Sequence, residues 1–268
     1  MIRIFYRQLG LAIGFLGILP ARCGSLAKDE DIGRSSVFFP VVGLIYGLIL
    51  ILSSLIIVPF FPKEVCGILL CLILVVLTRG LHIDGLSDTF DALGSNKNLE
   101  RKLEIMKDST IGPFGVTAVF FVLLLKIFLI ACLIGQGGLF YITILLFPVI
   151  GRWSMVIALY LGNPARSDGL GRVFFIHTKK FEIFWSTFML INILGIAVLI
   201  GYLVNPVSIT VYHRLLFFVV LPIIFLSSIY WKKIFTKSFG GLTGDNLGAI
   251  CELSEVLSLM AFVVIGGV

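Results

Sequence analysis

The sequence predicts an all-α, polytopic integral membrane protein with about seven transmembrane helices. Its composition differs from that of a soluble domain, because 59% of the 268 residues are hydrophobic and only 13% are charged, against about 25% charged residues in soluble proteins. A stretch of about 20 apolar residues matches the thickness of the hydrocarbon core. Six such stretches are clear, at 36–60, 65–79, 113–134, 139–160, 183–204 and 214–231. A seventh, at 247–268, carries two glutamates.

The connections between these stretches are too short to hold a soluble domain, so we expect one membrane-embedded domain over 1–268. Its first segment, 1–34, is apolar but short, contains Arg3 and Arg7, and stops at Pro20. We expect an N-terminal interfacial or re-entrant helix there. Three polar loops should share one side of the membrane: an acidic loop at 80–111 and two further loops at 161–182 and 232–246.

Basic residues indicate the orientation, since cytoplasmic loops of membrane proteins carry the excess of Lys and Arg. Of the 21 basic residues, 18 lie in four stretches that would share one side, at 1–35, 78–111, 152–180 and 231–246. We therefore expect a multi-pass protein of the bacterial cytoplasmic (inner) membrane whose active face is cytoplasmic. The isoelectric point near 9.1 is then a topology signal, and the expected partner is the lipid bilayer and no nucleic acid.

Three carboxylates, Asp84, Asp88 and Asp91, stand directly behind an apolar stretch, in LHIDGLSDTFDALGS. Their i, i+4, i+7 spacing places them within about 60° of arc on a helix. Unpaired carboxylates on one stripe repel each other, and desolvation at a membrane boundary adds to that cost. A bound divalent cation removes both penalties, and oxygen ligands favour Mg²⁺ first and Mn²⁺ second. The alternative is a solvated acidic helix end that binds nothing.

The segment SNKNLERKLEIMKDSTIGPFG predicts a capped, amphipathic helix over 98–107, ended by turn residues. Two interpretations of its end stay open. In one, the helix is a linker that lies on the lipid headgroups. In the other, Lys107 contacts a phosphate and Asp108 is an additional metal ligand.

Two glycine-rich segments carry chemistry that suits an anionic ligand. NPARSDGLGR combines Arg166 and Arg172 with a turn whose backbone amides can approach an anion closely. FGGLTGDNLGAICELSE contains four glycines before a helix that enters the membrane. The glycines proposed to bind phosphate in these segments are Gly169, Gly171 and Gly244. Glycines also serve helix packing, so the signal is weak by itself.

Acidic residues recur at the start of the last apolar stretch, as Asp245, Glu252 and Glu255. Glutamates inside a span are costly to bury and indicate function by default. The alternative is a structural role, in which they pair with the buried Lys126 or with Arg152.

The block GLHIDGLSDTFDAL, followed closely by RKLEIMKDSTIGPFGV, resembles the signature of the adenosylcobinamide-GDP ribazoletransferases, also called cobalamin synthases. The similarity continues through GRW (151–153), the AR and GLG elements at 165–171, and GGLTGDNLGAICELSE. It therefore covers most of the chain from Gly33 onward, and the long central block is its most specific part.

The resemblance implies that α-ribazole, or its 5′-phosphate, attacks the corrinoid-side phosphorus of adenosylcobinamide-GDP, giving adenosylcobalamin, or its 5′-phosphate, and GMP. Under it, Mg²⁺ on the diphosphate would be held by Asp84, Asp88 and Asp91. Candidates for a second metal or for the general base are Asp108, Asp245 and Glu252. Candidate phosphate contacts are Lys107, Arg166 and Arg172. Such a displacement needs an aligned nucleophile and neutralised charge.

Three other classes were compared with this one. A CDP-alcohol phosphotransferase has a denser D-G-x-x-A-R array, and a membrane prenyltransferase has two D-x-x-x-D clusters, whereas this chain has one. A cation-coupled transporter would carry acids near the midplane in two repeated halves, whereas most acids here lie at the cytoplasmic ends and no repeat is visible. The oligomeric state is left open, with a homo-oligomer among the alternatives.

Overall fold

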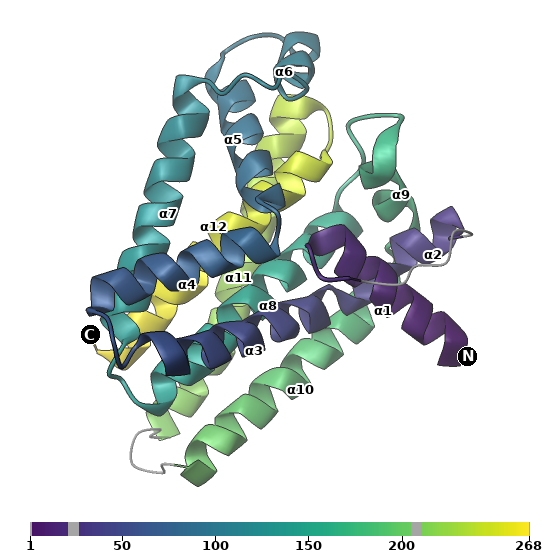
Figure 1. Cartoon of the computed structure of the whole chain (residues 1–268). Coiled ribbons are helices and arrows are strands. Elements are labelled where there is room, and N and C mark those ends of the chain that lie inside the picture. The colour runs from purple at the N-terminus through teal and green to yellow at the C-terminus, as the bar shows by residue number, and fades with distance from the viewer. Residues whose placement is uncertain (1, 21–26, 205–210, 268) are drawn as a thin grey trace.

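A computed structural model describes residues 2–20, 27–204 and 211–267 of the chain, which form a bundle of helices (Figure 1). The α-helices in these residues are α1 (Ile2–Leu16), α2 (Asp29–Arg34), α3 (Phe39–Ile57), α4 (Lys63–Leu77), α5 (Leu81–Gly94), α6 (Leu99–Ile105), α7 (Pro113–Leu133), α8 (Gly138–Leu161), α9 (Gly169–His177), α10 (Lys180–Val204), α11 (Val211–Phe239) and α12 (Gly244–Gly266). A short 3-10 helix, Ser35–Phe38, joins α2 to α3.

Six segments are long and apolar enough to cross a membrane, which confirms the all-α, polytopic prediction. The six are Asp29–Ile57, Pro113–Leu133, Gly138–Leu161, Lys180–Leu203, Val219–Phe239 and Gly244–Val264. The first begins seven residues before the predicted 36–60, because α2 and the 3-10 helix run on into α3. The seventh predicted stretch, at 247–268, is α12, and its glutamates do not interrupt the helix.

The predicted span at 65–79 is wrong as a complete crossing. Its helix, α4, has 15 residues, or about 22 Å, which is short of the roughly 30 Å hydrocarbon core. Only together with α5 is it long and apolar enough to cross, and the pair is bent by 90°, as in a broken span or a re-entrant loop. The bend is built on two residues in the left-handed region, Arg79 (φ 56°) and Gly80 (φ 69°). A side chain at positive φ is strained, and such strain gathers at functional sites.

The N-terminal helix α1 has 15 residues, too few to span the bilayer by itself, as expected for 1–34. Its C-terminal end is anchored in the bundle, because the Tyr46 hydroxyl donates to the Leu16 carbonyl at 3.1 Å and the Ile18 amide to the Leu77 carbonyl at 3.0 Å. Residues 21–26 of the predicted segment lie outside the described residues.

The bundle is organised around α8, whose spanning window is 94% buried. Glycines on α3 allow a close approach to it, since a Cβ at Gly43 would lie 2.5 Å from the Pro148 carbonyl oxygen and one at Gly47 2.3 Å from that of Leu145. Small residues at helix interfaces are typical of membrane bundles, where backbone contact replaces the hydrophobic effect. The second close partner of α8 is α12, so the segment with the glutamates lies against the centre of the fold.

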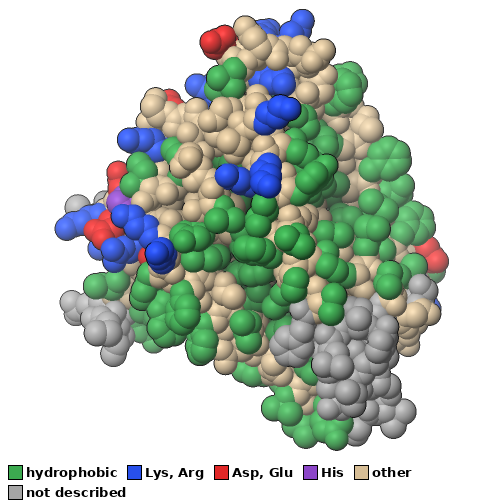
Figure 2. All heavy atoms as spheres, turned by 180° about the vertical axis from the view of Figure 1, so that it is seen from behind, with side chains coloured by type: hydrophobic (Ala, Val, Ile, Leu, Met, Phe, Trp, Pro, Cys, Tyr) green, Lys and Arg blue, Asp and Glu red, His purple; other side chains and the backbone are tan. Residues whose placement is uncertain are grey.

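Charged loops gather at one end of the bundle. In Figure 1 the short connections 58–62 and 134–137 lie at the lower left, whereas α6 and the turns before α9 and α12 lie toward the top. Figure 2 shows Lys and Arg side chains over the upper and left parts of one face and hydrophobic side chains over its middle. The predicted one-sided distribution of charge is therefore visible in the fold.

Candidate functional site

The three aspartates of the opening motif lie on one helix, α5, as predicted. Asp84 is exposed near its N-terminal end, and Asp88 and Asp91 are half-buried one and two turns later. The helix begins at the left-handed Gly80 and packs against both α7 and α12. The bend after α4 therefore places Asp88 and Asp91 against the neighbouring helices, while Asp84 stays exposed.

Asp91 is engaged by the backbone of α7. One carboxylate oxygen accepts the Gly112 amide at 2.7 Å and the other accepts the Gly115 amide at 2.8 Å. These amides are among the donors that an α-helix leaves unpaired at its N-terminus, and the negative charge suits the positive end of the helix dipole. Gly112 and Gly115 lack the Cβ that would collide with this carboxylate. Asp91 thus fastens α5 to α7.

Asp88 lies where negative charge is concentrated. The carboxylates of Asp84, Asp245 and Asp91 surround it with like charge, and Arg166 is the basic group that opposes them. A carboxylate among other carboxylates gains from a bound cation. The junction of α5 and α12 therefore has a deficit of positive charge.

The α5–α12 junction depends on a direct backbone contact. A Cβ at Gly85 would lie 2.7 Å from the carbonyl oxygen of Asp245 and 2.8 Å from its Cα. One turn further along α5, the side-chain amide (Nδ2) of Asn246 donates to the Thr89 hydroxyl at 3.0 Å. Asn246 also completes a capping box with Thr243 at the start of α12. These contacts hold Asp245 beside Asp84.

Replacing Gly85 by alanine is expected to destabilise the protein by about 1–3 kcal/mol, because the added methyl must displace backbone on α12. Denaturant unfolding in detergent measures this. The matched control is Gly195→Ala on α10, where a Cβ meets nothing within 4 Å and the substitution should leave stability unchanged or raise it. Equal stabilities of the two variants would contradict the close junction.

A small cavity of about 200 Å³ beside this junction collects the predicted anion-binding groups. Its walls are the segments 164–172 and 242–245, and the predicted residues that line it are Arg166, Gly169, Gly171, Arg172, Gly244 and Asp245. The two segments are joined by backbone hydrogen bonds, from Ala165 to the Leu242 carbonyl at 2.9 Å and from Leu242 to the Asn163 carbonyl at 2.8 Å. Two segments at least 70 positions apart in the sequence thus form one pocket.

Two helices begin at this cavity. Gly169 starts α9 with φ at 83°, a conformation that favours glycine, and Gly244 starts α12. A Cβ at Gly171 would lie 3.3 Å from the Gly244 amide nitrogen, so the two N-termini are adjacent. Free amides and dipoles at helix N-termini attract anions. We call this cavity the anion pocket.

Arg166 is held at the edge of the anion pocket with unused donors. One terminal nitrogen donates to the Leu103 carbonyl in α6 at 3.2 Å, while the buried Nε has no hydrogen-bond partner among the described residues. An unpaired buried donor is costly, and guanidinium groups pair well with phosphate oxygens. The arginine is therefore placed to receive an anionic ligand.

Lys107 and Asp108 are not brought into this site. Helix α6 forms with Asn98 as its cap, close to the predicted 98–107, but both residues follow it in an exposed turn. The Asp108 carboxylate accepts the Thr110 amide at 3.0 Å, which lowers the pKa of Asp108. No ion pair in the described part of the chain joins either residue to α5.

Glu252 lies in a separate, buried cluster inside the bundle. Lys126 of α7 donates to Glu252 at 2.6 Å and also contacts Glu255, which is in turn paired with Arg152 of α8. Arg152 further approaches His82, with 3.4 Å between Nη2 and Nδ1. The cluster contains two positive and two negative groups, so its charge is balanced. The structural interpretation of these glutamates is thus the one that the geometry supports.

A metal centre made of protein ligands alone is not present in the described residues, where no three His, Cys, Asp or Glu side chains are close enough together to hold one ion. Mg²⁺ is ordinarily bound by one or two carboxylates together with substrate phosphates, and not by an all-protein cage. The exposed Asp84 and the half-buried Asp88 fit that mode, while each oxygen of Asp91 already accepts one amide at the N-terminus of α7.

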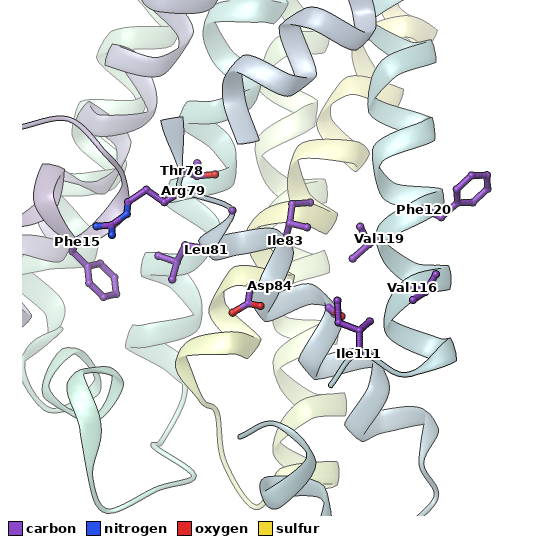
Figure 3. A pocket seen from close by; sticks show the side chains of 12 residues that line it. Phe15, Thr78, Arg79, Leu81, Ile83, Asp84, Ile111, Val116, Val119 and Phe120 are labelled. Carbon is purple, nitrogen blue, oxygen red and sulfur yellow. The ribbon is translucent and has the colours of Figure 1, made fainter. Parts of the chain in front are cut away.

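Sequence reasoning missed a cavity of about 840 Å³, which adjoins α5 on the α7 side (Figure 3). Ser87 and Asp84 line it, together with Arg79 at the bend. A signal existed in the sequence, because Ser87 stands three residues after Asp84 and shares its helical face. The apolar residues of the cavity wall gave no such signal in the sequence, because every membrane span contains similar side chains.

These features define a polytopic membrane protein in which a carboxylate junction separates an anion pocket from a larger apolar cavity. The chain belongs to the family described as Cobalamin-5-phosphate synthase, whose profile matches residues 8–263. It is 35% identical over 257 residues to the adenosylcobinamide-GDP ribazoletransferase of Caldanaerobacter subterraneus, covering 96% of this chain and 97% of that one. It is 37% identical over 261 residues to the protein of the same name from Acetivibrio thermocellus, covering 96% and 98%. No solved structure matches the chain.

Proposed function

We propose that this chain transfers the adenosylcobinamide phosphate group of adenosylcobinamide-GDP to α-ribazole or to α-ribazole 5′-phosphate, releasing GMP. The family and the names of relatives that match over nearly the whole chain support the reaction. One observation supports placing this reaction at a particular site. The carboxylates of α5 lie close to the arginines and helix N-termini of the anion pocket. The proposed localisation is the bacterial cytoplasmic membrane, with this end of the bundle in the cytoplasm, as the Lys and Arg bias suggests.

In the proposed reaction the ribose 3′-hydroxyl forms a new bond to the corrinoid-side phosphorus, and the bond from that phosphorus to the bridging oxygen breaks. GMP leaves with the bridging oxygen, and the hydroxyl proton passes to the carboxylate cluster. Arg166, Arg172 and the amides at Gly169 and Gly244 stabilise charge on the diphosphate. Positioning and charge stabilisation are the main contributions that a protein makes to such displacements.

A divalent cation, Mg²⁺ or Mn²⁺, would be held by Asp84 and Asp88 together with the diphosphate, and it would neutralise charge on the leaving group. The concentration of negative charge around Asp88 supports this assignment. Asp245, which lines the anion pocket beside the same junction, would orient the nucleophile or take its proton.

The test uses purified protein in liposomes and measures GMP. Release is expected only when adenosylcobinamide-GDP, the ribazole substrate and Mg²⁺ are all present, and it should cease on addition of EDTA and return with excess Mg²⁺ or Mn²⁺. GMP formed without the ribazole would indicate hydrolysis and would contradict the transferase. If GMP formed at the same rate in EDTA, the proposed role of the divalent cation would be contradicted, but the transfer reaction would not.

A further inference from the structure

The cavity of about 840 Å³ next to α5 has the character of a small-molecule site. It lies between α5 and α7, and Phe15 of α1 and the α4–α5 bend also line it (Figure 3). One wall is apolar, made by Ile83, Ile111, Val116 and Val119. Ligand pockets of about 300–1,000 Å³ typically combine such walls with a few polar groups that orient the ligand.

The α5 wall carries the polar residues Asp84 and Ser87, and Thr78 and Arg79 line the cavity at the α4–α5 bend. The Ser87 side chain is 96% buried, since its exposed fraction is 4%, it lines the cavity, and its Oγ has no hydrogen-bond partner in the described residues. Gly115 keeps the space beside it open, because a Cβ there would lie 2.5 Å from that Oγ. Most buried hydroxyls have a hydrogen-bond partner, so the Ser87 hydroxyl is available to a polar group of a ligand in this cavity.

The cavity and the anion pocket lie on the two sides of one contact. Asp84 lines the cavity, and Asp245 lines the anion pocket. The residue next to Asp84, Gly85, touches the Asp245 backbone. A two-substrate transfer needs two sites whose ligands meet at the reacting atoms, and this contact supplies such a meeting point.

The charge of the cavity decides which substrate it takes. The cavity offers a diphosphate fewer positive groups than the anion pocket does, because the only basic residue in its lining is the exposed Arg79 at the bend, whereas the anion pocket has Arg166 and Arg172. Adenosylcobinamide carries a corrinoid macrocycle and an adenosyl group, which together exceed the drug-sized ligands that such a volume encloses. A nucleoside with a fused aromatic base is within that size, and it has an apolar base and a ribose that donates hydrogen bonds.

We propose that this cavity binds the ribazole acceptor, with its fused aromatic base against the apolar wall of α7 and its ribose hydroxyls against Asp84 and Ser87. The assignment rests on the proposed function. It places the attacking hydroxyl at the α5–α12 junction, facing the diphosphate in the anion pocket. Ser87 then donates to or accepts from the ribose and is a specificity residue for the acceptor.

The test is Val119→Trp, which fills the cavity from α7. The KM for α-ribazole is expected to rise at least about tenfold, with the KM for adenosylcobinamide-GDP within twofold of the unchanged protein. The matched control is Leu125→Trp on the same helix, since Leu125 is 41% exposed and does not line the cavity. This control should leave both constants unchanged. An unaltered ribazole KM in a folded Val119→Trp variant would overturn the proposal.

Two further measurements keep the proposal testable if the tryptophan variant does not fold or if the proposed function fails. Ser87→Ala should raise the ribazole KM by about 2- to 10-fold and leave the melting temperature unchanged. Calorimetric binding of α-ribazole to the purified protein needs no turnover. Binding that Val119→Trp abolishes supports the cavity even if GMP is never released, whereas binding that neither variant weakens overturns it.

Discussion

Asp84→Asn is expected to lower the rate of GMP release by about 10²–10³-fold, the usual effect of removing one preorganised electrostatic group. The asparagine keeps the size of the side chain but loses the charge that faces both substrates. Stability should not fall, because Asp84 is exposed and its removal relieves repulsion on Asp88. Parallel assays of GMP release and of thermal unfolding in detergent measure the two effects.

The matched control for Asp84→Asn is Glu104→Gln. Glu104 is exposed on α6, at the same charged end of the bundle, and pairs with Arg101 at 2.6 Å. An exposed pair contributes about 0–1 kcal/mol, so activity and stability should both stay near those of the unchanged protein. If both variants lost activity alike, the effect would be one of surface charge and not of the α5 carboxylate.

Lys126→Met is expected to destabilise the protein by about 3–5 kcal/mol, because it leaves Glu252 without its cation in the bundle interior. The Glu255 side chain keeps Arg152 as a partner. The control is Lys63→Met, whose lysine is exposed at the start of α4, and this change should have little effect. Denaturant unfolding in detergent compares the two.

A double variant separates charge balance from catalysis. Lys126→Met combined with Glu252→Gln removes one charge of each sign, so most of the lost stability should return. Activity of this variant decides the role of Glu252. Near-normal GMP release confirms a structural glutamate, whereas a folded but inactive double variant would restore Glu252 as a catalytic candidate.

The parts of the fold that sequence predicts well are those set by local composition. Hydropathy located the spans because a bilayer imposes length and polarity on each helix separately. The break at Arg79 and Gly80 was not visible, since glycine alone signals a left-handed conformation and the preceding arginine does not. The 65–79 stretch therefore resembled a complete span.

The site was predictable only in part. Spacing identified the α5 stripe, and residue type identified the arginines and glycines of the anion pocket. The hydrogen bonds from the amides of Gly112 and Gly115 to Asp91 were not predictable, because those glycines lie over 20 residues later in the chain. The apolar cavity depends on how α1, α5 and α7 pack, which is a tertiary property that no single segment encodes.

The central claim is that this chain moves the corrinoid-side phosphate from GMP to the ribazole. The direct measurement uses adenosylcobinamide-GDP labelled with ³²P at the corrinoid-side phosphorus, incubated with the purified protein, α-ribazole and Mg²⁺. All label should appear in the corrinoid product that contains the ribazole, and the released GMP should be unlabelled. Label in the nucleotide product, or in a corrinoid phosphate that lacks the ribazole, would contradict the claim.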